Sequence, residues 1–363
     1  MTSLRSPAFA LQLRSRSAAL FPGSRILSLR PLGESTSGGT EKATGYGRPL
    51  RVDLELAGGE LRQFVFHVAQ PNEFGHDRRS DRAADALLTW DAARSLPKQA
   101  AVLDVGAMTP DRFVPLRDSD EFYTITEYAE GVPYADSLSA IGRRGTLTTA
   151  DLERTDALAD YLVDLHAEKI DSPTRYRRAV RDLIGHGEGV FGLVDSFPDN
   201  VPGASLDRID ALERRCVFWR RSLHGRTERL CRTHGDFHPF NILFQPDGEL
   251  LLLDASRGCA GDPADDATCL AVNYLFFGSA DLQAAGLFRR LWDRFWERYL
   301  GRTGDEGLLS SAPPYLAWRV LVLVNPLWYP NVSEATRDAL LRLAESSLDA
   351  GRLDLDDVQL VFQ

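Results

Sequence analysis

The sequence predicts an α+β protein with two lobes, a small strand-rich lobe followed by a larger helical one. Its 363 residues are too many for a single small core. Apolar residues recur at every second position early in the chain and at helical spacing later on. The segment Glu130-Gly131-Val132-Pro133 interrupts both patterns and would form a hinge. We therefore expect a basic flexible segment over residues 1–24, an N-lobe over residues 25–130 and a helical C-lobe over residues 131–363.

The N-lobe is expected to be built around a hairpin. Leu50, Val52 and Leu54 alternate with polar residues, as in a half-buried strand. Ala57-Gly58-Gly59 would form a tight turn, after which residues 61–69 return as a second strand. A helix over residues 77–96 and two further strands, around residues 102–105 and 122–128, complete this lobe.

The C-lobe is expected to be mostly helical. Thr148 and Asp151 provide a capping-type start for its first long helix. A short apolar hairpin is predicted from residues 242–244 and 250–253, because Pro246-Asp247-Gly248 separates the two runs. Asp262 and Asp265 could face the acceptor pocket or cap a helix, and Asp262 is interpreted as the cap. Core packing is the interpretation for most of Trp318, Arg319, Trp328 and Tyr329, with the lining of a substrate cleft as the alternative. The expected helices cover residues 148–169, 206–223, 265–277, 280–300, 314–324 and 333–349.

Composition excludes some functions and leaves the location open. The net charge of -10 argues against a general nucleic-acid binder and weakly suits a cationic substrate. No apolar run is long enough for a membrane span. The four cysteines form no C-x-x-C pair, which indicates reduced thiols and a cytoplasmic protein. Five arginines precede the first acid, Glu34, so import into an organelle is the alternative.

One segment carries residues suited to phosphoryl transfer. Residues 231–244 read CRTHGDFHPFNILF, and the predicted hairpin would bring Asp254 back beside Asn241. Phosphoryl transfer needs a carboxylate near the attacking hydroxyl and hard oxygen ligands for Mg²⁺. Asp254 directly follows a buried apolar strand, where a metal ion would offset the cost of burying a carboxylate. Asp236, Asn241 and Asp254 are therefore expected to converge on one metal-nucleotide site.

The motifs HGDFHPFN, LLDASRG and GDPADD resemble the signature of the aminoglycoside phosphotransferase and choline kinase superfamily. The resemblance implies a bilobal protein-kinase-like fold whose N-lobe binds ATP or GTP, and transfer of the γ-phosphoryl group to a hydroxyl of a small molecule. It implies that Asp236 is the catalytic base or hydroxyl-orienting group. Asn241 and Asp254 would be the Mg²⁺ ligands, Asp266 would brace the catalytic loop, and His234 would be structural.

Three positions depart from the superfamily pattern. Ala255-Ser256 stands where an aromatic and a small residue usually follow the metal-binding acid, and Phe240 stands where glycine is common. His67 occupies the position of the lysine that binds the nucleotide phosphates. A neutral imidazole cannot supply the same point charge.

Two residues could replace the missing lysine. Lys42 lies in the glycine-containing segment 38–47 and could reach the phosphates from there. Alternatively, His67 is protonated beside Asp81 or Asp85 and acts as the cation itself. A neutral His67 with a solvated Lys42 is the remaining interpretation.

Two other functions compete with the kinase. A degenerate kinase would bind nucleotide without turnover, as the departures at His67 and Ala255-Ser256 suggest. A metal-dependent hydrolase would use His234, Asp236, His238 and Asp254 as its metal cluster. That interpretation leaves Asn241 and the strand-rich lobe without a role.

The expected partners are a nucleoside triphosphate and a small hydroxyl-bearing acceptor, with no nucleic acid and no membrane. The identity of the acceptor is not encoded in these motifs.

Overall fold

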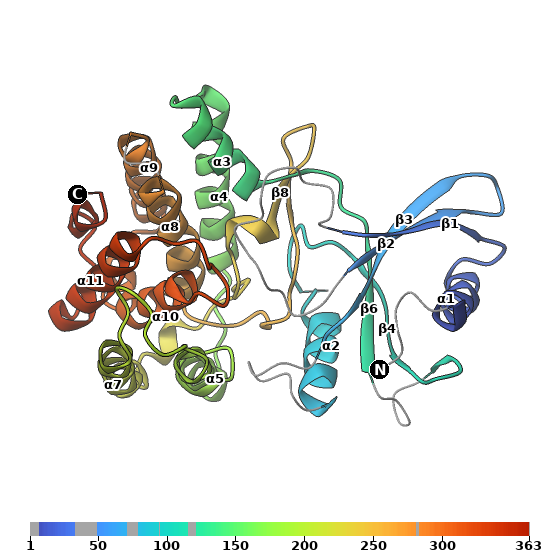
Figure 1. Ribbon diagram of the computed structural model, residues 1–363, viewed down its shortest axis with the longest axis horizontal. Helices are drawn as coiled ribbons and strands as arrows, with labels where there is room; N and C mark the ends of the chain where they lie inside the picture. The colour runs from blue at the N-terminus through green and yellow to red at the C-terminus, as the bar shows by residue number, and fades with distance from the viewer. Residues whose placement is uncertain are drawn as a thin grey trace. The chain divides into compact units, whose positions relative to one another are not determined.

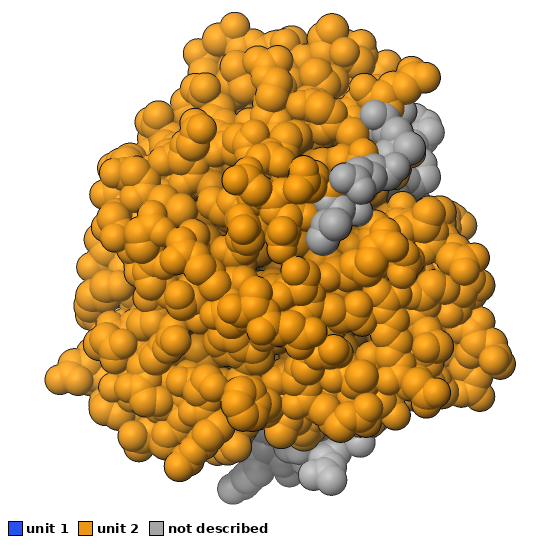
Figure 2. Space-filling view, turned by 90° about the vertical axis from the view of Figure 1, so that its left-hand side faces the viewer, with its two compact units in different colours: residues 1–40, 45–130 blue, residues 41–44, 131–363 orange. Residues whose placement is uncertain are grey.

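The computed structural model describes residues 7–32, 49–70, 79–93, 95–114, 121–280 and 283–362. These residues form two compact units, an N-terminal unit that ends at Glu130 and a C-terminal unit that begins at Gly131. The first is built on a sheet and the second is mainly helical, so the predicted α+β fold class is confirmed (Figure 1). Figure 2 shows one face of the C-terminal unit, on which side chains pack into a continuous surface.

The N-terminal unit is a six-stranded sheet with the order β1-β2-β3-β6-β4-β5. Every pair of neighbouring strands is antiparallel, and Leu50 of β2 lies opposite Phe66 of β3. Alternate residues of β2, β3 and β6 are fully buried on one face, among them Val52, Phe64 and Ile125. Its elements are α1 (Pro7–Leu20), β1 (Arg25–Pro31), β2 (Leu50–Glu55), β3 (Leu61–Val68), α2 (Arg79–Ala93), β4 (Val102–Met108), β5 (Phe113–Val114) and β6 (Glu121–Glu127).

Helix α1 differs from the flexible basic segment expected over residues 1–24. It packs beside β1 and β5, and the side chains of Phe9 and Leu13 have no exposed surface (Figure 1). Arg16 makes a two-pronged ion pair with Asp104 of β4, with both N–O distances at 2.6 Å. Phe9 and Leu13 are four positions apart and so lie on one helix face. Two apolar residues are hard to recognise as a helix face in a segment rich in arginine. Arg16 anchors the helix through its ion pair with Asp104.

The C-terminal unit contains the predicted short hairpin and its helices. The strand β7 joins the hairpin to give the order β7-β8-β9, and Ile242 lies opposite Leu252. Helix α8 is buried along nearly its whole length and packs against α9 and α10. Its elements are β7 (Val132–Pro133), α3 (Tyr134–Arg144), α4 (Thr149–His166), α5 (Pro173–Gly185), α6 (Val190–Asp195), α7 (Leu206–Leu223), β8 (Ile242–Phe244), β9 (Leu250–Leu252), α8 (Pro263–Ser279), α9 (Ala285–Thr303), α10 (Ala312–Val324) and α11 (Glu334–Ala350).

Local sequence signals explain where two of these helices begin. Thr148 caps α4 and exchanges hydrogen bonds with Asp151, as the capping pattern predicts. Asp262 caps α8 by accepting from the backbone N–H of Ala264, and Pro263 follows in the first turn, where its missing N–H costs nothing. This start sets the position of Asp265 and Asp266 in the first turn of α8. Asp266 contacts the backbone of the loop of residues 231–241, which holds the HGDFHPFN motif and is called the catalytic loop below.

The helices and the cysteines bear on two expectations from the sequence, namely the absence of a membrane span and the reduced state of the thiols. Within the described residues, no helix is both long and apolar enough to cross a membrane. All four cysteines are described, and each carries a free thiol.

Candidate active site

Asp266 holds the backbone of the catalytic loop in place. Its two oxygens accept separate hydrogen bonds from the backbone N–H groups of His234 and Gly235, both at 2.7 Å. His166 of α4 lies 3.2 Å from the same carboxylate, which is completely buried. Burial favours the neutral acid, but His166 and His234 outweigh it, so the pKa of Asp266 lies below its usual range. The loop is therefore fixed by an ionised buried acid.

Gly235 has to be glycine in this loop. Its φ is +81°, and a Cβ placed there would lie 2.9 Å from Cβ of Arg257. A side chain would meet both a disfavoured backbone conformation and a steric clash. Glycine thus lets the loop turn sharply just before Asp236.

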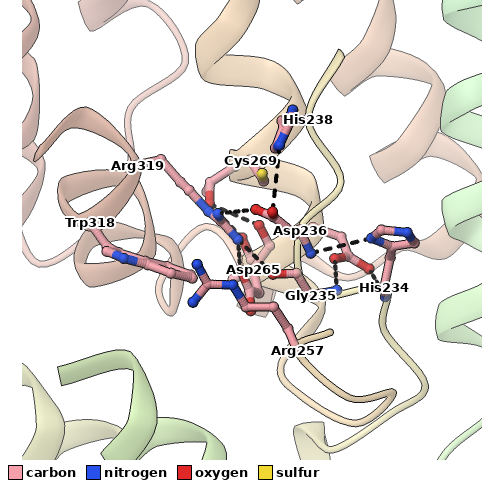
Figure 3. A network of polar contacts seen from close by, with 12 residues as sticks. His234, Gly235, Asp236, His238, Arg257, Asp265, Cys269, Trp318 and Arg319 are labelled. Atoms are coloured by element: carbon pink, nitrogen blue, oxygen red, sulfur yellow. Dashed lines mark hydrogen bonds and ion pairs between the residues drawn. The ribbon is translucent and has the colours of Figure 1, made fainter. Parts of the chain in front are cut away.

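The side chain of Asp236 lies beside three polar side chains of the site. Its Oδ1 accepts a hydrogen bond from Nη1 of Arg319 at 2.8 Å (Figure 3). Its Oδ2 lies 3.3 Å from Nδ2 of Asn241 and 3.5 Å from Nε2 of His238. Burial opposes ionisation, but His238, Arg319 and Arg257 together hold the pKa of Asp236 well below its usual range. Asp236 is thus a charged carboxylate at neutral pH.

The contacts of Arg319 with Asp236 and Asp265 are not predicted by the sequence patterns. The interpretation of this α10 residue as core packing captures its burial, since it is only 6% exposed, but not its role. Its Nη2 also donates to the carbonyl of Gly235 at 2.8 Å and to Oδ1 of Asp265 at 2.7 Å. An arginine inside an apolar helix, RVLVLV, is a signal that a buried partner must exist.

A second arginine lies near the same carboxylates. Arg257 follows the hairpin and is 3.3 Å from Glu188, while its guanidinium carbon lies 4.9 Å from the ring centre of Trp318. Trp318 donates its ring N–H to the carbonyl of Glu188 at 2.8 Å. Figure 3 shows the guanidinium groups of Arg257 and Arg319 close to Trp318. The acids and the arginines of this cluster therefore pair with one another.

Asp265 stands next to Asp266 but has a different environment. Burial raises the pKa of Asp265 to about 6. Arg319 lowers this pKa, but the negative charge of Asp266 raises it. The pKa values of the two adjacent acids of GDPADD are thus shifted in opposite directions, upward for Asp265 and downward for Asp266. Asp266 holds the loop backbone, whereas Asp265 holds Arg319.

The hairpin places Asp254 beside the loop. The backbone N–H of Leu253 donates to the carbonyl of Asn241 at 2.9 Å, which ties the end of β9 to the loop. Asp254 is exposed, contrary to the expectation of a buried carboxylate, because its φ of +58° turns the chain out of the strand. Its Oδ1 accepts from the N–H of Ser256 at 3.0 Å, which leaves Oδ2 for another partner.

Asn241 and Asp254 fit the requirements of a magnesium ion. The amide nitrogen of Asn241 donates to Asp236, so its Oδ1 is the atom that can face a cation. A carboxamide oxygen and a carboxylate oxygen are hard donors, and Mg²⁺ commonly takes few protein ligands and completes its shell with water and phosphate oxygens. These residues could thus hold the metal that the sequence predicts.

The hydrolase alternative does not fit the structure. His234 is fully buried and its Nε2 faces the carbonyl of Leu253 at 3.0 Å. In the part of the chain that the structure describes, no group of three or more His, Cys, Asp or Glu residues could hold a metal ion. The H-x-D-x-H cluster expected for a hydrolase is therefore not formed.

Comparison with known proteins identifies the family. Residues 58–300 match the family described as phosphotransferase enzyme family, which is more than half of the chain. The chain belongs to this family. Its motifs and catalytic loop lie within the matched region, so the expectation drawn from HGDFHPFN and GDPADD is confirmed at the level of the family.

One solved kinase structure has the same overall fold as this phosphotransferase, and two others were found with lower similarity. A microcompartment-associated aminopropanol kinase is 15% identical, with a TM-score of 0.54 and coverage of 95% of this chain and 99% of its own. A choline kinase from Streptococcus pneumoniae is 14% identical, with a TM-score of 0.49 and coverage of 94% and 99%. An aminoglycoside phosphotransferase from Streptomyces rimosus is 18% identical, with a TM-score of 0.48 and coverage of 90% and 100%. No curated protein matches.

The phosphate-binding residues of this phosphotransferase stay predictions. His67 lies on β3 opposite Thr124 of β6 and is half-buried. Lys42 lies outside the described residues. The backbone of Asp81 belongs to α2, but its side chain is also outside what the structure describes. The choice between Lys42 and a protonated His67 is therefore an experimental question.

Replacing Asp266 with asparagine should destabilise the C-terminal unit. Asparagine has one acceptor oxygen, so its NH₂ group would meet one of the two backbone N–H donors, at a cost of about 1–3 kcal/mol. Because the folded-state pKa of Asp266 is lowered, its contribution is present above about pH 4 and is lost as the pH falls through the folded value. Urea unfolding of Asp266→Asn and wild type at pH 7 and at pH 3 would measure both effects.

The matched control is Asp247→Asn, in the exposed turn of the hairpin. Asp247 accepts a single backbone hydrogen bond, from Glu249, which asparagine can also accept. Its stability should equal that of wild type. An Asp266→Asn protein as stable as wild type at pH 7 would show that the loop is not held in this way.

Proposed function

We propose that this phosphotransferase moves the γ-phosphoryl group of ATP or GTP, with Mg²⁺, to a hydroxyl of a small molecule. The observation that carries the proposal is the arrangement of the loop and the hairpin. They bring Asp236, Asn241 and the end of β9 together through hydrogen bonds of 2.9–3.3 Å. Phosphoryl transfer depends mainly on positioning and on charge neutralisation, and this arrangement suits both.

The residues of the loop have separate roles in this mechanism. Mg²⁺, when bound, neutralises charge on the phosphate oxygens. Asn241 and Asp254 would hold it through their side-chain oxygen atoms. Asp236 orients the acceptor hydroxyl, whose oxygen forms a bond to the γ-phosphorus while the bond to the bridging oxygen breaks. The hydroxyl proton passes late to Asp236, and the nucleoside diphosphate leaves.

The paired acids of the site add little support for a cationic acceptor. Asp265 and Glu188 are two acids of the polar cluster that includes Asp236. Each is paired with an arginine, at 2.7 Å to Arg319 and 3.3 Å to Arg257. A paired carboxylate attracts a further cation more weakly than an unpaired one. These two acids therefore add little to the weak preference for a cation that the net charge of -10 suggests.

A second candidate is a nucleotide-binding protein with little or no turnover. The observation that favours it is that His238 and the buried Arg319 both lie beside Asp236 and together lower the basicity of its carboxylate. The sequence departures at His67 and Ala255-Ser256 agree with it. Because general-base assistance in phosphoryl transfer is mostly orientation, a lowered pKa does not by itself abolish the reaction.

Binding of ATP or GTP should require Mg²⁺ and Asp254. Thermal unfolding with each nucleotide, with and without Mg²⁺, measures this directly, since a ligand raises the melting temperature of the state that it binds. We expect Mg²⁺-dependent stabilisation of wild type and none of Asp254→Ala. Asp247→Ala removes an exposed acid from the same hairpin and should behave as wild type. Equal stabilisation of wild type and Asp254→Ala would remove Asp254 from the metal site.

Lys42 should contribute more to nucleotide affinity than an ordinary loop lysine. We expect Lys42→Ala to weaken binding of Mg²⁺-ATP at least about tenfold, the scale of one charged phosphate contact. Lys98→Ala removes an exposed lysine of the N-terminal unit and is the control, which should bind normally. Titration calorimetry gives the dissociation constants. A silent Lys42→Ala with a severe His67→Ala would assign the cation to His67, and two silent variants would exclude both residues.

A further inference from the structure

Arg319 connects three segments of the C-terminal unit through one guanidinium group. It extends from α10, and its partners are Asp236 and Gly235 in the catalytic loop and Asp265 at the start of α8 (Figure 3). All three distances are 2.7–2.8 Å. The guanidinium carbon also lies 3.7 Å from the ring centre of Trp318. A group held from this many sides has little freedom to move.

The chemistry of these contacts requires arginine. The two terminal nitrogens serve different partners: Nη1 serves Asp236, while Nη2 serves Gly235 and Asp265. Only a planar guanidinium presents donors in such a fixed fork, whereas a lysine ammonium is a single point charge. An arginine that is 6% exposed is costly to bury unless its charge is fully matched. Its two carboxylate partners provide that match.

The contact with Arg319 makes the two oxygens of Asp236 unequal. Oδ1 is held at 2.8 Å by a charged donor. Oδ2 has longer contacts, at 3.3 Å to Asn241 and 3.5 Å to His238. A carboxylate oxygen accepts more than one hydrogen bond, so Oδ2 retains the capacity to accept from a hydroxyl.

We propose that Arg319 is a positioning residue that fixes the rotation of the Asp236 carboxylate and so reserves Oδ2 for the acceptor hydroxyl. This rests on the proposed function, because it assigns a role in the same transfer. Asp265 acts one step further away by fixing Arg319. The adjacent acids of GDPADD then have complementary roles, since Asp266 fixes the loop backbone and Asp265, through Arg319, fixes the side chain of Asp236.

A purely structural role for Arg319 would have different consequences. If Arg319 only stabilised α10, its replacement would lower the melting temperature and leave the turnover of the folded protein unchanged. A positioning role lowers turnover in the folded protein and leaves nucleotide affinity unchanged, because Asp236 orients the hydroxyl. Alignment of reacting groups affects the rate steeply, since small misplacements are costly.

The experiment compares Arg319→Gln, Arg319→Lys, Asp265→Asn and the double variant Arg319→Gln/Asp265→Asn. Turnover of Mg²⁺-ATP is measured under saturating conditions, with water or the best hydroxyl acceptor of a broad panel. The dissociation constant of ADP and the melting temperature are measured on the same samples. Arg208→Gln is the matched control, because Arg208 also bridges two acids, Asp338 and Glu345, away from the loop.

We expect Arg319→Gln to lose at least about tenfold in turnover while ADP affinity stays within about twofold. Arg319→Lys keeps the charge but not the fork, so it should recover part of the loss. Asp265→Asn should lose less than Arg319→Gln, and the double variant should be no slower than Arg319→Gln alone, because Asp265 acts through Arg319. Arg208→Gln should lose stability only.

Several results would overturn the inference. Equal turnover in wild type and the folded Arg319 variants would do so, and so would a double variant whose losses multiply. If Arg319→Gln does not fold, Arg319→Lys and Asp265→Asn decide the matter by the same comparison. A wild type that binds Mg²⁺-ATP but shows no turnover would instead refute the proposed function, and the inference with it.

Discussion

The two hydrogen bonds from the backbone of His234 and Gly235 to Asp266 are the contacts on which the rest of the site depends. They join the catalytic loop to the first turn of α8, a helix buried along nearly its whole length. The start of that helix is itself fixed by the cap at Asp262. A loop held at its backbone keeps Asp236 at a constant position, which pre-organises the site before any substrate binds. The usual mobility of loops is thereby suppressed where chemistry is expected.

Side-chain geometry is added to this backbone frame by pairs of opposite charges. Arg319 is engaged by Asp236 and Asp265, and Arg257 by Glu188. A buried charge is tolerable only when it is matched, so each of these residues constrains the others. The cluster therefore combines a high density of charge with little net charge.

Sequence patterns predicted the fold class and the main elements of both units. The hairpin at residues 242–253 and the cap at Asp262 follow from local rules, because turn residues and caps act on their near neighbours. Contacts between distant segments, such as Arg319 with Asp236, leave no periodic trace, and only the isolated arginine in α10 hinted at one. Helix α1 was missed because two apolar residues, Phe9 and Leu13, are too few to stand out among arginines.

The central claim is that Asp236 serves the acceptor hydroxyl and not the nucleotide. Asp236→Asn keeps the shape of the side chain and removes its charge, so it separates the two roles. The measurement is Mg²⁺-ATP turnover at saturation together with the ADP dissociation constant, for both proteins. We predict that turnover falls roughly a hundredfold or more, the usual scale for a lost general base, while ADP affinity is nearly unchanged. Equal turnover in Asp236→Asn and an active wild type would contradict the account.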